Sequence, residues 1–326
     1  AAKTVVLKMQ APANAVQGAG TTHTATIIEQ NIRPLVDFNV SQSGEPTRTV
    51  YTYDGPVVVR AGIRDPNPDD THVFEWSATD NRLFSETGLD TADFSFDPQY
   101  LETGLYKLSV AVMDDGAPVE ETKADVMLNV VLESPILSDL EDQDQDGFTD
   151  AAEGTVDTDQ DGIPDYLDNI DNPAVLQGLN GTSDHHLLVA EAGVQLKLGA
   201  TALAAGQAAA LVSLDDISNF GGLDGGTGVS SKRSSGFPGG LYDFVITGLP
   251  EAGQAVQIVL PQLTPLPKAA VYNKYIPGFG WQKFITSGGN AIASARGSNG
   301  VCPAPGDPSY RKGLRAGNYC VQLTIV

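Results

Sequence analysis

The chain has 326 residues, with 41 acidic and 19 basic side chains and a formal net charge of −22 at pH 7. This balance argues against a nucleic-acid partner, because phosphate backbones are bound by clusters of Lys and Arg and the sequence has no such cluster. The best apolar run, residues 200–212, is shorter than the roughly 18 residues that cross a bilayer, so we expect no membrane span.

The acidic residues are concentrated in the middle of the chain. Residues 133–172 contain 14 Asp or Glu and no Lys or Arg, whereas residues 1–132 carry a net charge of −10 and residues 173–326 carry +2. At this length the chain exceeds one ordinary domain, and the acidic segment is the natural divider. The 35 Gly and 20 Pro suit β domains with many turns.

Residues 1–32 are predicted to form two strands, 4–9 and 23–28, around a Gly-rich loop, with a hinge at 31–34. The sequence from Asn14 to Ile27, Asn-Ala-Val-Gln-Gly-Ala-Gly-Thr-Thr-His-Thr-Ala-Thr-Ile, resembles the closing hairpin of a Calx-beta-type repeat. The resemblance implies that the chain begins in the middle of a domain. A lone hairpin is marginally stable in water, so it should pair with the neighbouring sandwich or with another copy of the chain.

Residues 33–133 are predicted to form a β-sandwich. From Arg48 onward, short segments with period-2 alternation are separated by turns, and roughly seven strands in about 100 residues is typical of a sandwich. Trp76 is expected in the core between the sheets. The best strands are 49–53, 57–63, 72–76, 94–96, 105–113 and 126–132.

Three motifs in this part, Asp65-Pro-Asn-Pro-Asp-Asp-Thr-His-Val-Phe-Glu-Trp76, Leu101-x-x-Gly-x-Tyr106 and Val110-Ala-Val-Met-Asp-Asp-Gly116, resemble the immunoglobulin-like and PKD-type repeats of bacterial surface proteins. Six polar side chains could form a calcium site at one pole of the sandwich, but turn chemistry accounts for them equally well and is the favoured interpretation. They are Asp65, Asn67, Asp69, Asp70, Asp114 and Asp115.

Two central segments share one spacing: Asp142-Gln-Asp-Gln-Asp-Gly147 and Asp157-Thr-Asp-Gln-Asp-Gly162. Carboxylates at alternate positions, followed by a glycine that permits a sharp turn, surround a hard cation with oxygen and predict bound Ca²⁺. We name residues 142–153 loop 1 and residues 157–168 loop 2. The ligands predicted at positions 1, 3, 5, 7 (a backbone carbonyl), 9 and 12 are Asp142, Asp144, Asp146, Phe148, Asp150 and Glu153, and Asp157, Asp159, Asp161, Ile163, Asp165 and Asp168.

Bound ions are expected to be what folds this segment. Carboxylates about 4 Å apart repel by on the order of 1 kcal/mol per pair even in water. Each loop has five acids, so one Ca²⁺ per loop leaves a formal −3, and the sequence predicts two or more ions, with a third shared ion plausible. A solvated acidic linker is the alternative, and the repeated spacing argues against it.

The surrounding residues distinguish between calcium architectures. An EF-hand needs a helix on each side of its loop, but three residues separate the loops, Gly154 breaks an exiting helix and Pro135 shortens an entering one. Pro164 also lacks the N–H that paired EF-hands use at position 8. Residues 134–173 instead resemble a thrombospondin type 3 repeat array, with Asp-x-Asp-x-Asp-Gly-x-x-Asp at 142–150 and 157–165; a dockerin would want a helix after each loop.

Residues 174–326 are predicted to form an all-β sandwich or jelly roll. The blocks Pro238-Gly-Gly-Leu-Tyr-Asp-Phe-Val-Ile-Thr, Gly280-Trp-x-x-Phe284 and Gly317-Asn-Tyr-Cys-Val-Gln-Leu-Thr-Ile resemble the choice-of-anchor U domain of large exported bacterial proteins. The resemblance implies a domain truncated at its C-terminus, without its anchor, outside or on the surface of a Gram-negative bacterium. The strands are expected at 187–198, 209–214, 242–247, 255–261, 270–275, 281–285 and 320–326.

The two cysteines, Cys302 and Cys320, are predicted to form a disulfide. Closing a loop of this size contributes about 3 kcal/mol to stability. Disulfides persist in oxidising compartments, which agrees with a calcium-dependent extracellular protein.

No catalytic motif is present, so we expect no enzyme. Asp184-His185-His186 could bind a metal but is typical of a solvated turn. Four aromatic residues around a Gly-Pro turn could stack on a sugar: Tyr272, Tyr275, Phe279 and Trp281.

Together these features predict a mainly β chain with two β-sandwich domains joined by a calcium-binding ribbon of loops. The expected function is that of a calcium-stabilised extracellular structural or adhesion module, in which Ca²⁺ makes the linker between the domains a rigid spacer. Its partners would be other surface proteins, copies of itself or glycans. The alternatives are a subunit of an extracellular filament or sheath, assembled by strand pairing between copies, and a carbohydrate-binding module.

Overall fold

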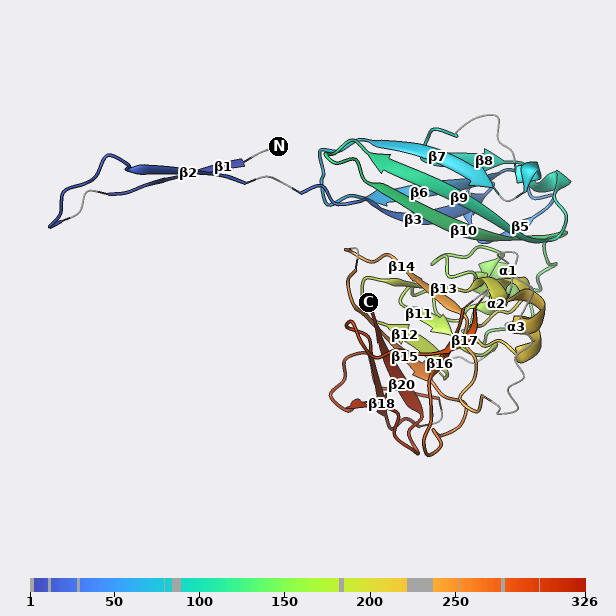
Figure 1. The fold of residues 1–326 in the computed structure, drawn as a ribbon. Helices are drawn as coiled ribbons and strands as arrows, with labels where there is room; N and C mark the ends of the chain where they lie inside the picture. The colour runs from blue at the N-terminus through green and yellow to red at the C-terminus, as the bar shows by residue number, and fades with distance from the viewer. Residues whose placement is uncertain are drawn as a thin grey trace.

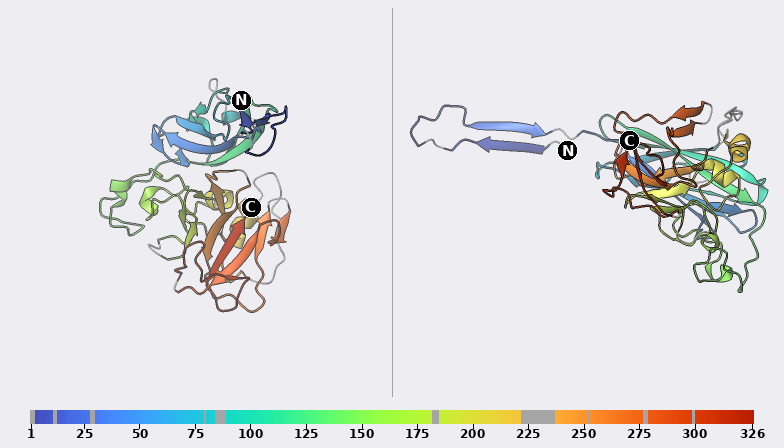
Figure 2. Two further views of the ribbon diagram at one scale, coloured as in Figure 1. Left: turned by 90° about the vertical axis from the view of Figure 1, so that its left-hand side faces the viewer. Right: turned by 90° about the horizontal axis from the view of Figure 1, so that it is seen from below.

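The computed structural model describes residues 3–10, 13–27, 30–78, 80–83, 89–181, 185–221, 237–251, 253–276, 279–298 and 300–326. It is mainly β, as predicted, with two β domains stacked against each other and a hairpin that extends away from both (Figures 1 and 2). The hairpin consists of β1 (Lys3–Lys8) and β2 (Thr22–Ile27), paired antiparallel. The predicted end of its second strand, Ile28, lies outside the described residues.

The N-terminal β domain is a sandwich of two four-stranded sheets, with strand orders β4-β3-β6-β8 and β5-β10-β9-β7. The strands of the first sheet are β3 (Leu35–Gln42), β4 (Glu45–Pro46), β6 (Val57–Arg64) and β8 (Asp93–Phe96). Those of the second are β5 (Thr49–Tyr51), β7 (His72–Ala78), β9 (Gly104–Asp114) and β10 (Glu121–Val131), with 3₁₀ turns η1 (Asn81–Leu83) and η2 (Pro98–Tyr100) in the connections.

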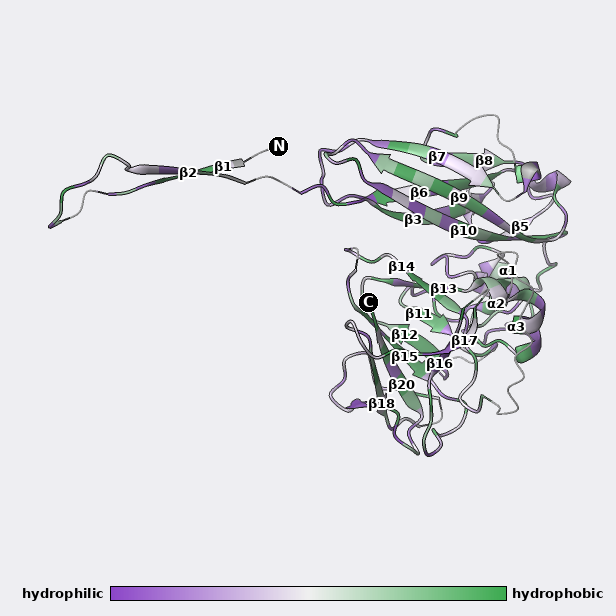
Figure 3. Cartoon of the chain, in the orientation of Figure 1, coloured by the Kyte–Doolittle hydropathy of each residue, from purple (hydrophilic) through white to green (hydrophobic). Residues whose placement is uncertain are grey.

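Alternation along the strands builds the core of this sandwich. Buried and partly exposed residues alternate through β9, so one face points inward, and Figure 3 shows the matching alternation in hydropathy along β9 and β10. Trp76 is 6 % exposed and packs between Phe38 and Phe94, with ring centroids 6.0 and 5.5 Å away. The prediction that Trp76 fills the core is confirmed. β3 was not among the predicted strands, although Val36, Phe38 and Val40 carry the same period-2 signal.

The C-terminal β domain is organised around one six-stranded sheet of order β11-β12-β15-β20-β18-β19, accompanied by the pairs β13-β14 and β16-β17. The first hydrophobic core cluster of the chain lies inside the N-terminal sandwich, and the second lies in this domain. The second core cluster includes Leu188, Leu196, Ile258 and Leu323. The sheet strands are β11 (Val175–Gln177), β12 (Leu187–Ala190), β15 (Val256–Pro261), β18 (Ala291–Ala295), β19 (Arg311–Lys312) and β20 (Cys320–Ile325). The paired strands are β13 (Gln195–Leu198), β14 (Phe244–Thr247), β16 (Asn273–Ile276) and β17 (Gly280–Lys283).

Two predicted strands of this domain differ in the structure. The strand expected at 209–214 is reduced to a single bridge between Leu211 and Tyr242, flanked by helices α2 (Ala200–Ala204) and α3 (Leu214–Phe220). Alanine favours helix, and a capping box between Ser213 and Asp216 starts α3. The strand expected at 187–198 is split into β12 and β13, which belong to different sheets. Within the described residues, no helix is long and apolar enough to cross a membrane.

The two β domains touch directly. Leu105 and Met127, on the outer face of the β5-β10-β9-β7 sheet, pack against the second core cluster. Nη1 of Arg64 donates to the carbonyls of Gly248 and Leu249 at 3.1 Å each, and Gly248 N donates to Oδ1 of Asp37 at 3.0 Å. The acidic segment also lies at the boundary between the two domains (Figures 1 and 2). The domains are therefore docked, which corrects the expectation that the linker acts as a spacer between them.

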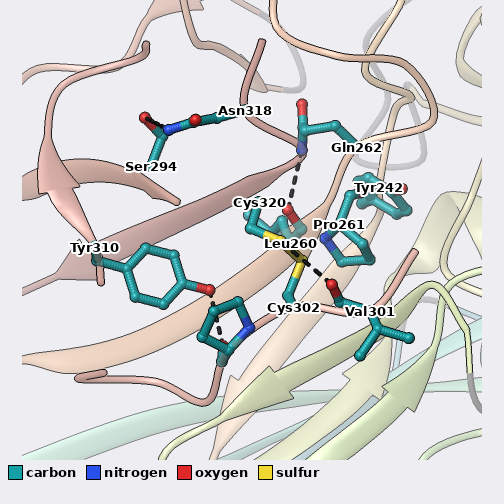
Figure 4. Close-up of a disulfide and its surroundings, with 11 residues drawn as sticks. Tyr242, Leu260, Pro261, Gln262, Ser294, Val301, Cys302, Tyr310, Asn318 and Cys320 are labelled. Atoms are coloured by element: carbon teal, nitrogen blue, oxygen red, sulfur yellow. Dashed lines mark hydrogen bonds between the residues drawn. A yellow bond between two sulfur atoms is a disulfide. The ribbon is translucent and has the colours of Figure 1, made fainter. Parts of the chain in front are cut away.

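The Cys302–Cys320 disulfide is present as predicted and joins a loop to the buried strand β20 (Figure 4). Around it, Tyr310 Oη donates to the carbonyl of Pro303 at 2.8 Å, and Asn318 Nδ2 donates to Ser294 Oγ at 3.0 Å. The cross-link closes a sequence separation of 18 residues.

We expect loss of this cross-link to weaken the six-stranded sheet. Replacing both cysteines by Ala should lower the free energy of unfolding by about 3 kcal/mol. This corresponds to a decrease of roughly a hundredfold in the amide exchange protection of β18 and β20. Hydrogen exchange measures this, with the amides of β9 as an internal control. Reduction of the unaltered chain should reproduce the effect, and unchanged protection in β20 after both treatments would show that the disulfide contributes nothing.

Candidate metal centre

Loops 1 and 2 repeat one pattern of internal hydrogen bonds. At position 1, Asp142 Oδ2 accepts Gly147 N at 3.3 Å, and Asp157 Oδ2 accepts Gly162 N at 3.1 Å. The aspartates at positions 3 and 5 likewise each accept one backbone N–H from two residues further on, at 2.7 to 3.3 Å. One oxygen of each carboxylate thus shapes the loop.

The second oxygen of most of these carboxylates is buried and has no hydrogen-bond partner. In each loop, one carboxylate oxygen from each of the first three aspartates lies within 4.8 Å of the others. Two ligands of one Ca²⁺, each about 2.3–2.6 Å from the ion, are about 5 Å apart at most, so this spacing fits a single cation. The atoms without a partner are Asp142 Oδ1, Asp144 Oδ2, Asp157 Oδ1, Asp159 Oδ2 and Asp161 Oδ2.

The backbone of the two loops repeats as well. Gly147 and Gly162 have φ of +105° and +104°, which side chains strongly disfavour and which explains the glycine at position 6. Gln145 and Gln160, at position 4, have φ of +65° and +60°. Loop 1 ends in one helical turn, α1 (Asp150–Glu153), and η3 (Asp165–Leu167) lies at the corresponding place in loop 2. Within residues 89–181, which the structure describes without a gap, neither loop is flanked by the long helices that an EF-hand uses.

The acids at position 9 are already engaged by protein donors. Asp150 accepts Gln143 N at Oδ1 and Gln143 Nε2 at Oδ2, at 2.9 and 2.7 Å. Asp165 accepts Thr158 N and Thr158 Oγ1 in the same way, at 2.8 and 2.7 Å. Their predicted role as ligands stays a prediction. Their contacts make them braces that hold position 2 of each loop, and any ligation would add to those bonds.

The acids at position 12 lie close to the first three aspartates of their loops. Glu153 Oε2 is buried with no hydrogen-bond partner, and burial, then Asp144 and Asp146, raises the pKa of this carboxyl to about 7. Asp168 is 5 % exposed, and burial together with Asp159 raises its pKa to about 8. Such acids lack compensating positive charge, which is the electrostatic environment that a divalent cation stabilises.

Loop 2 is much more deeply buried than loop 1. At position 7, Phe148 of loop 1 is 64 % exposed, whereas Ile163 of loop 2 is 1 % exposed and belongs to the second core cluster. Burial raises the pKa of Asp157 to about 7 and of Asp159 to about 6, and raises that of Asp161 well above its ordinary value. Identical spacing therefore produces one surface loop and one interior loop.

Loop 2 also forms hydrogen bonds to both β domains. Asp157 N donates to the carbonyl of Pro46 at 3.0 Å, and Gln160 Oε1 accepts Val40 N at 3.1 Å, both on the N-terminal sandwich. On the other side, Leu198 N in β13 donates to the carbonyl of Asp161 at 2.6 Å. The conformation of loop 2 is thus coupled to the docking of the two domains.

Two buried basic side chains accompany loop 2, one from each domain. Arg48 precedes β5 and Lys197 lies on β13; they are 8 % and 6 % exposed. Burial lowers the pKa of Arg48, while Asp157 and Asp161 act in the opposite direction. Burial and then Arg48 lower the pKa of Lys197 to about 8, opposed by Asp37, Asp157 and Asp159. Neither residue was predicted to belong to the site, because both lie far in the sequence from the acidic segment, residues 133–172.

Asp171 was missed as well. Burial, then Asp165 and Asp146, raises its pKa, so it lies close to acids of both loops. It also raises the pKa of Asp159 and Asp168. Asp171 falls three residues beyond position 12 of loop 2. Only its place within the acidic segment, residues 133–172, could have indicated that it belongs to the site.

The predicted sugar platform is divided in the structure. Tyr272 packs against the second core cluster and meets Phe284 edge-on at 6.0 Å. Trp281 stacks on Phe237 at 4.5 Å and contacts Tyr275 edge-on, while Phe279 is 78 % exposed. The Pro277-Gly278 turn, which stands between Tyr275 and Phe279 in the sequence, lies outside the described residues.

The histidine motif is only partly described, because Asp184 lies outside the described residues. His186 N donates to the carbonyl of Gly300 at 2.9 Å, and burial and then His185 lower the pKa of its imidazole.

No protein-family model and no curated protein matches this chain. One solved structure that it resembles is a nucleoside hydrolase-related hypothetical protein from Saccharophagus degradans associated with carbohydrate metabolism, at 20 % identity over 31 % of this chain and 26 % of that one, with a TM-score of 0.25. Another is Sidekick-1 immunoglobulin domains 1–5, at 11 % identity over 91 % of this chain and 54 % of that one, with a TM-score of 0.23. The chain thus spans about a quarter of the length of the first and about half of the length of the second.

The brace on Asp165 leads to a prediction about calcium affinity. Thr158→Val removes the Oγ1 donor with little change of shape and should weaken the affinity of loop 2 for Ca²⁺ about tenfold, the usual size of such indirect effects. Calcium titration calorimetry measures this. Gln145→Ala, on the exposed surface of loop 1, is the control and should leave both affinities unchanged. Equal affinities in Thr158→Val and the parent would contradict the role of the brace.

Proposed function

We propose that the chain is a calcium-stabilised structural or adhesion module of the cell exterior, in which Ca²⁺ bound to loop 2 holds two β domains in one fixed arrangement. The observation that carries the proposal is the position of loop 2. Its converging carboxylate oxygens belong to the same short segment that hydrogen-bonds Pro46 and Val40 on one side and Leu198 on the other. Loop 1, whose Phe148 is exposed, would bind a second ion at the surface.

The electrostatics explain why such an arrangement would depend on the ion. Loop 2 carries five acids, and Arg48 and Lys197 supply two positive charges beside it. Buried carboxylates without full compensation are costly, so the apo loop would be expected to move its acids toward water and release its bonds to both domains. Bound Ca²⁺ would supply two further positive charges and ligate the oxygens that lack partners.

An extracellular location is supported by the disulfide and by the proposed calcium dependence. Disulfides persist in oxidising compartments, and extracellular calcium modules are commonly tuned to about 10⁻⁴–10⁻³ M. The likeness of residues 134–173 to thrombospondin type 3 repeats, and of the C-terminal part to choice-of-anchor U domains, favours a protein of a Gram-negative bacterial surface. A non-enzymatic role, with other surface proteins, copies of itself or glycans as partners, belongs to the same proposal.

A second candidate function, assembly by strand pairing, is favoured by the hairpin. β1 and β2 extend away from both domains (Figure 1), and Val5, Val6 and Leu7 are 44, 52 and 62 % exposed. An isolated two-stranded hairpin is marginal in water, and its edges offer backbone groups to another sheet. Another copy of the chain, or a neighbouring surface protein, could supply that sheet.

Chelation provides the main test of the calcium proposal. Removal of Ca²⁺ should lower amide exchange protection across residues 139–171 by roughly tenfold or more, because the loops open locally. It should also expose Gly248 N, whose bond to Asp37 joins the two domains away from the loops. Hydrogen exchange with and without chelator measures both effects.

Matched variants separate the two loops. Asp159→Asn in loop 2 keeps the oxygen that accepts Asp161 N but lowers the charge of the site, and it should expose Gly248 N as chelation does. Asp144→Asn, the same position in loop 1, should leave Gly248 N protected. Retention of Gly248 protection both after chelation and in Asp159→Asn would overturn the proposed role of loop 2.

The assembly function is tested by a substitution in the hairpin. Val6→Pro removes an N–H from β1 and should abolish any concentration-dependent association of the chain measured by analytical ultracentrifugation. Val16→Pro, in the connecting loop outside both strands, serves as the control. A parent chain that stays monomeric at every concentration tested would dismiss pairing between copies.

A further inference from the structure

Three carboxylates meet at the end of the N-terminal sandwich where the linker from the hairpin enters. Asp65 follows β6, Asp70 precedes β7 and Asp114 is the last residue of β9, so strands far apart in the sequence bring them together. One oxygen from each lies within 4.8 Å of the others, the same spacing as in the two loops. The linker residue Asn31 lies against this group, with Nδ2 donating to Asp114 Oδ1 at 2.9 Å.

Several oxygens of this group have no hydrogen-bond partner. Asn31 is 6 % exposed; its Nδ2 also donates to the carbonyl of Pro118 at 2.7 Å, but its Oδ1 has no partner. Asp114 is 4 % exposed, and its Oδ2 likewise has none. Asp70 Oδ2 is the third such atom. A buried amide oxygen beside two buried carboxylate oxygens, all unpaired, is the donor set of a hard cation.

Turn chemistry, the interpretation favoured by the sequence, accounts for only part of this arrangement. Asp65 Oδ1 accepts Asn67 N at 2.7 Å, and Asp114 Oδ1 accepts the N–H groups of Gly116 and Glu120 at 3.1 and 2.9 Å. These bonds use one oxygen of each carboxylate, as in loops 1 and 2. The second oxygen of Asp114 is not involved in the turn.

Among the described residues, His72 is the one basic side chain that contacts this group. Elsewhere on the sandwich, Asp93 pairs with Arg60 and Asp125 with Lys107. Within the described part of the chain, no Lys or Arg pairs with Asp65, Asp70 or Asp114, and the one nearby titratable base is His72, whose Nε2 lies 2.7 Å from Asp65 Oδ2.

We propose that Asp65, Asp70, Asp114 and the amide oxygen of Asn31 form a further Ca²⁺ site, separate from loops 1 and 2. The ligands come from three strand ends and from the linker, so the bound ion joins the linker to the sandwich. Asn67 supports the same junction, because its Oδ1 accepts Ile32 N at 2.9 Å and its Nδ2 donates to the carbonyl of Gln30 at 3.3 Å. The ion thereby fixes the direction in which the hairpin leaves the sandwich.

Close packing around Asn31 agrees with a built site. A Cβ on Gly116 would come within 2.3 Å of the Asn31 amide group, so only glycine at this position lets the amide lie against Asp114. Gly116→Ala would therefore displace the amide oxygen without changing any charge.

Calcium titration followed by backbone amide NMR tests this site in the full-length chain. The amides of Asn31, Asp70 and Asp115 should shift with added CaCl₂ in a single transition. Asp70→Asn should raise the midpoint of that transition at least about tenfold, because one charged ligand is lost. Asp69→Asn, the adjacent exposed acid outside the group, should leave the midpoint within about twofold of the parent.

The readout is local, so the result does not depend on the ions of loops 1 and 2. Gly116→Ala should weaken the transition as Asp70→Asn does, and it provides a second variant should either substitution disturb the fold. The proposal is overturned if these three amides do not respond to calcium while the amides of residues 142–168 do. It is equally overturned if Asp69→Asn and Asp70→Asn change the midpoint by the same factor.

Discussion

The structure depends on how charge is compensated at the boundary between its two β domains. Loop 2 places Asp157, Asp161 and Asp168 at 0 to 5 % exposure, where unbalanced carboxylates are unfavourable. Only Arg48 and Lys197 lie beside them as positive charges in the described part of the chain. A cation in loop 2 would supply the positive charge that these two bases do not. Because the same segment forms hydrogen bonds to both domains, binding of the proposed ion would be coupled to the docking of the domains.

The two loops show how one local pattern acquires different roles. Their hydrogen bonds, glycine conformations and braces at position 9 match residue for residue. They differ in what surrounds them: Phe148 is exposed, and Ile163 is part of the second core cluster. Loop 2 therefore packs in the core and forms hydrogen bonds to both β domains, while the side-chain hydrogen bonds described for loop 1 lie within the loop itself. The site proposed at the end of the N-terminal sandwich would use the same kind of unpaired carboxylate oxygens, contributed by different strands.

Local patterns predicted much of the fold and of the candidate site. Alternation located β6, β7, β9 and β10, the Asp-Gly spacing located both loops, and the cysteine pair predicted the disulfide. Three kinds of feature were not predicted from the sequence. The strand expected at 209–214 is reduced to a single bridge, and the short helices on either side of it, α2 and α3, were not predicted. Arg48, Lys197 and Asn31 join acids from which they are distant in sequence, so only the tertiary structure reveals them. The docking of the domains was not predicted for the same reason, because the sequence of the acidic segment by itself resembles that of a spacer.

The most direct test of the central claim is small-angle X-ray scattering of the intact chain in calcium and in excess chelator. If Ca²⁺ in loop 2 holds the two β domains together, chelation should increase the radius of gyration and the maximum dimension and give the scattering profile of two domains that move independently. Restored calcium should return the original profile, and Asp144→Asn should behave as the parent does. Superimposable profiles with and without calcium would contradict the claim that the ion fixes the arrangement of the domains.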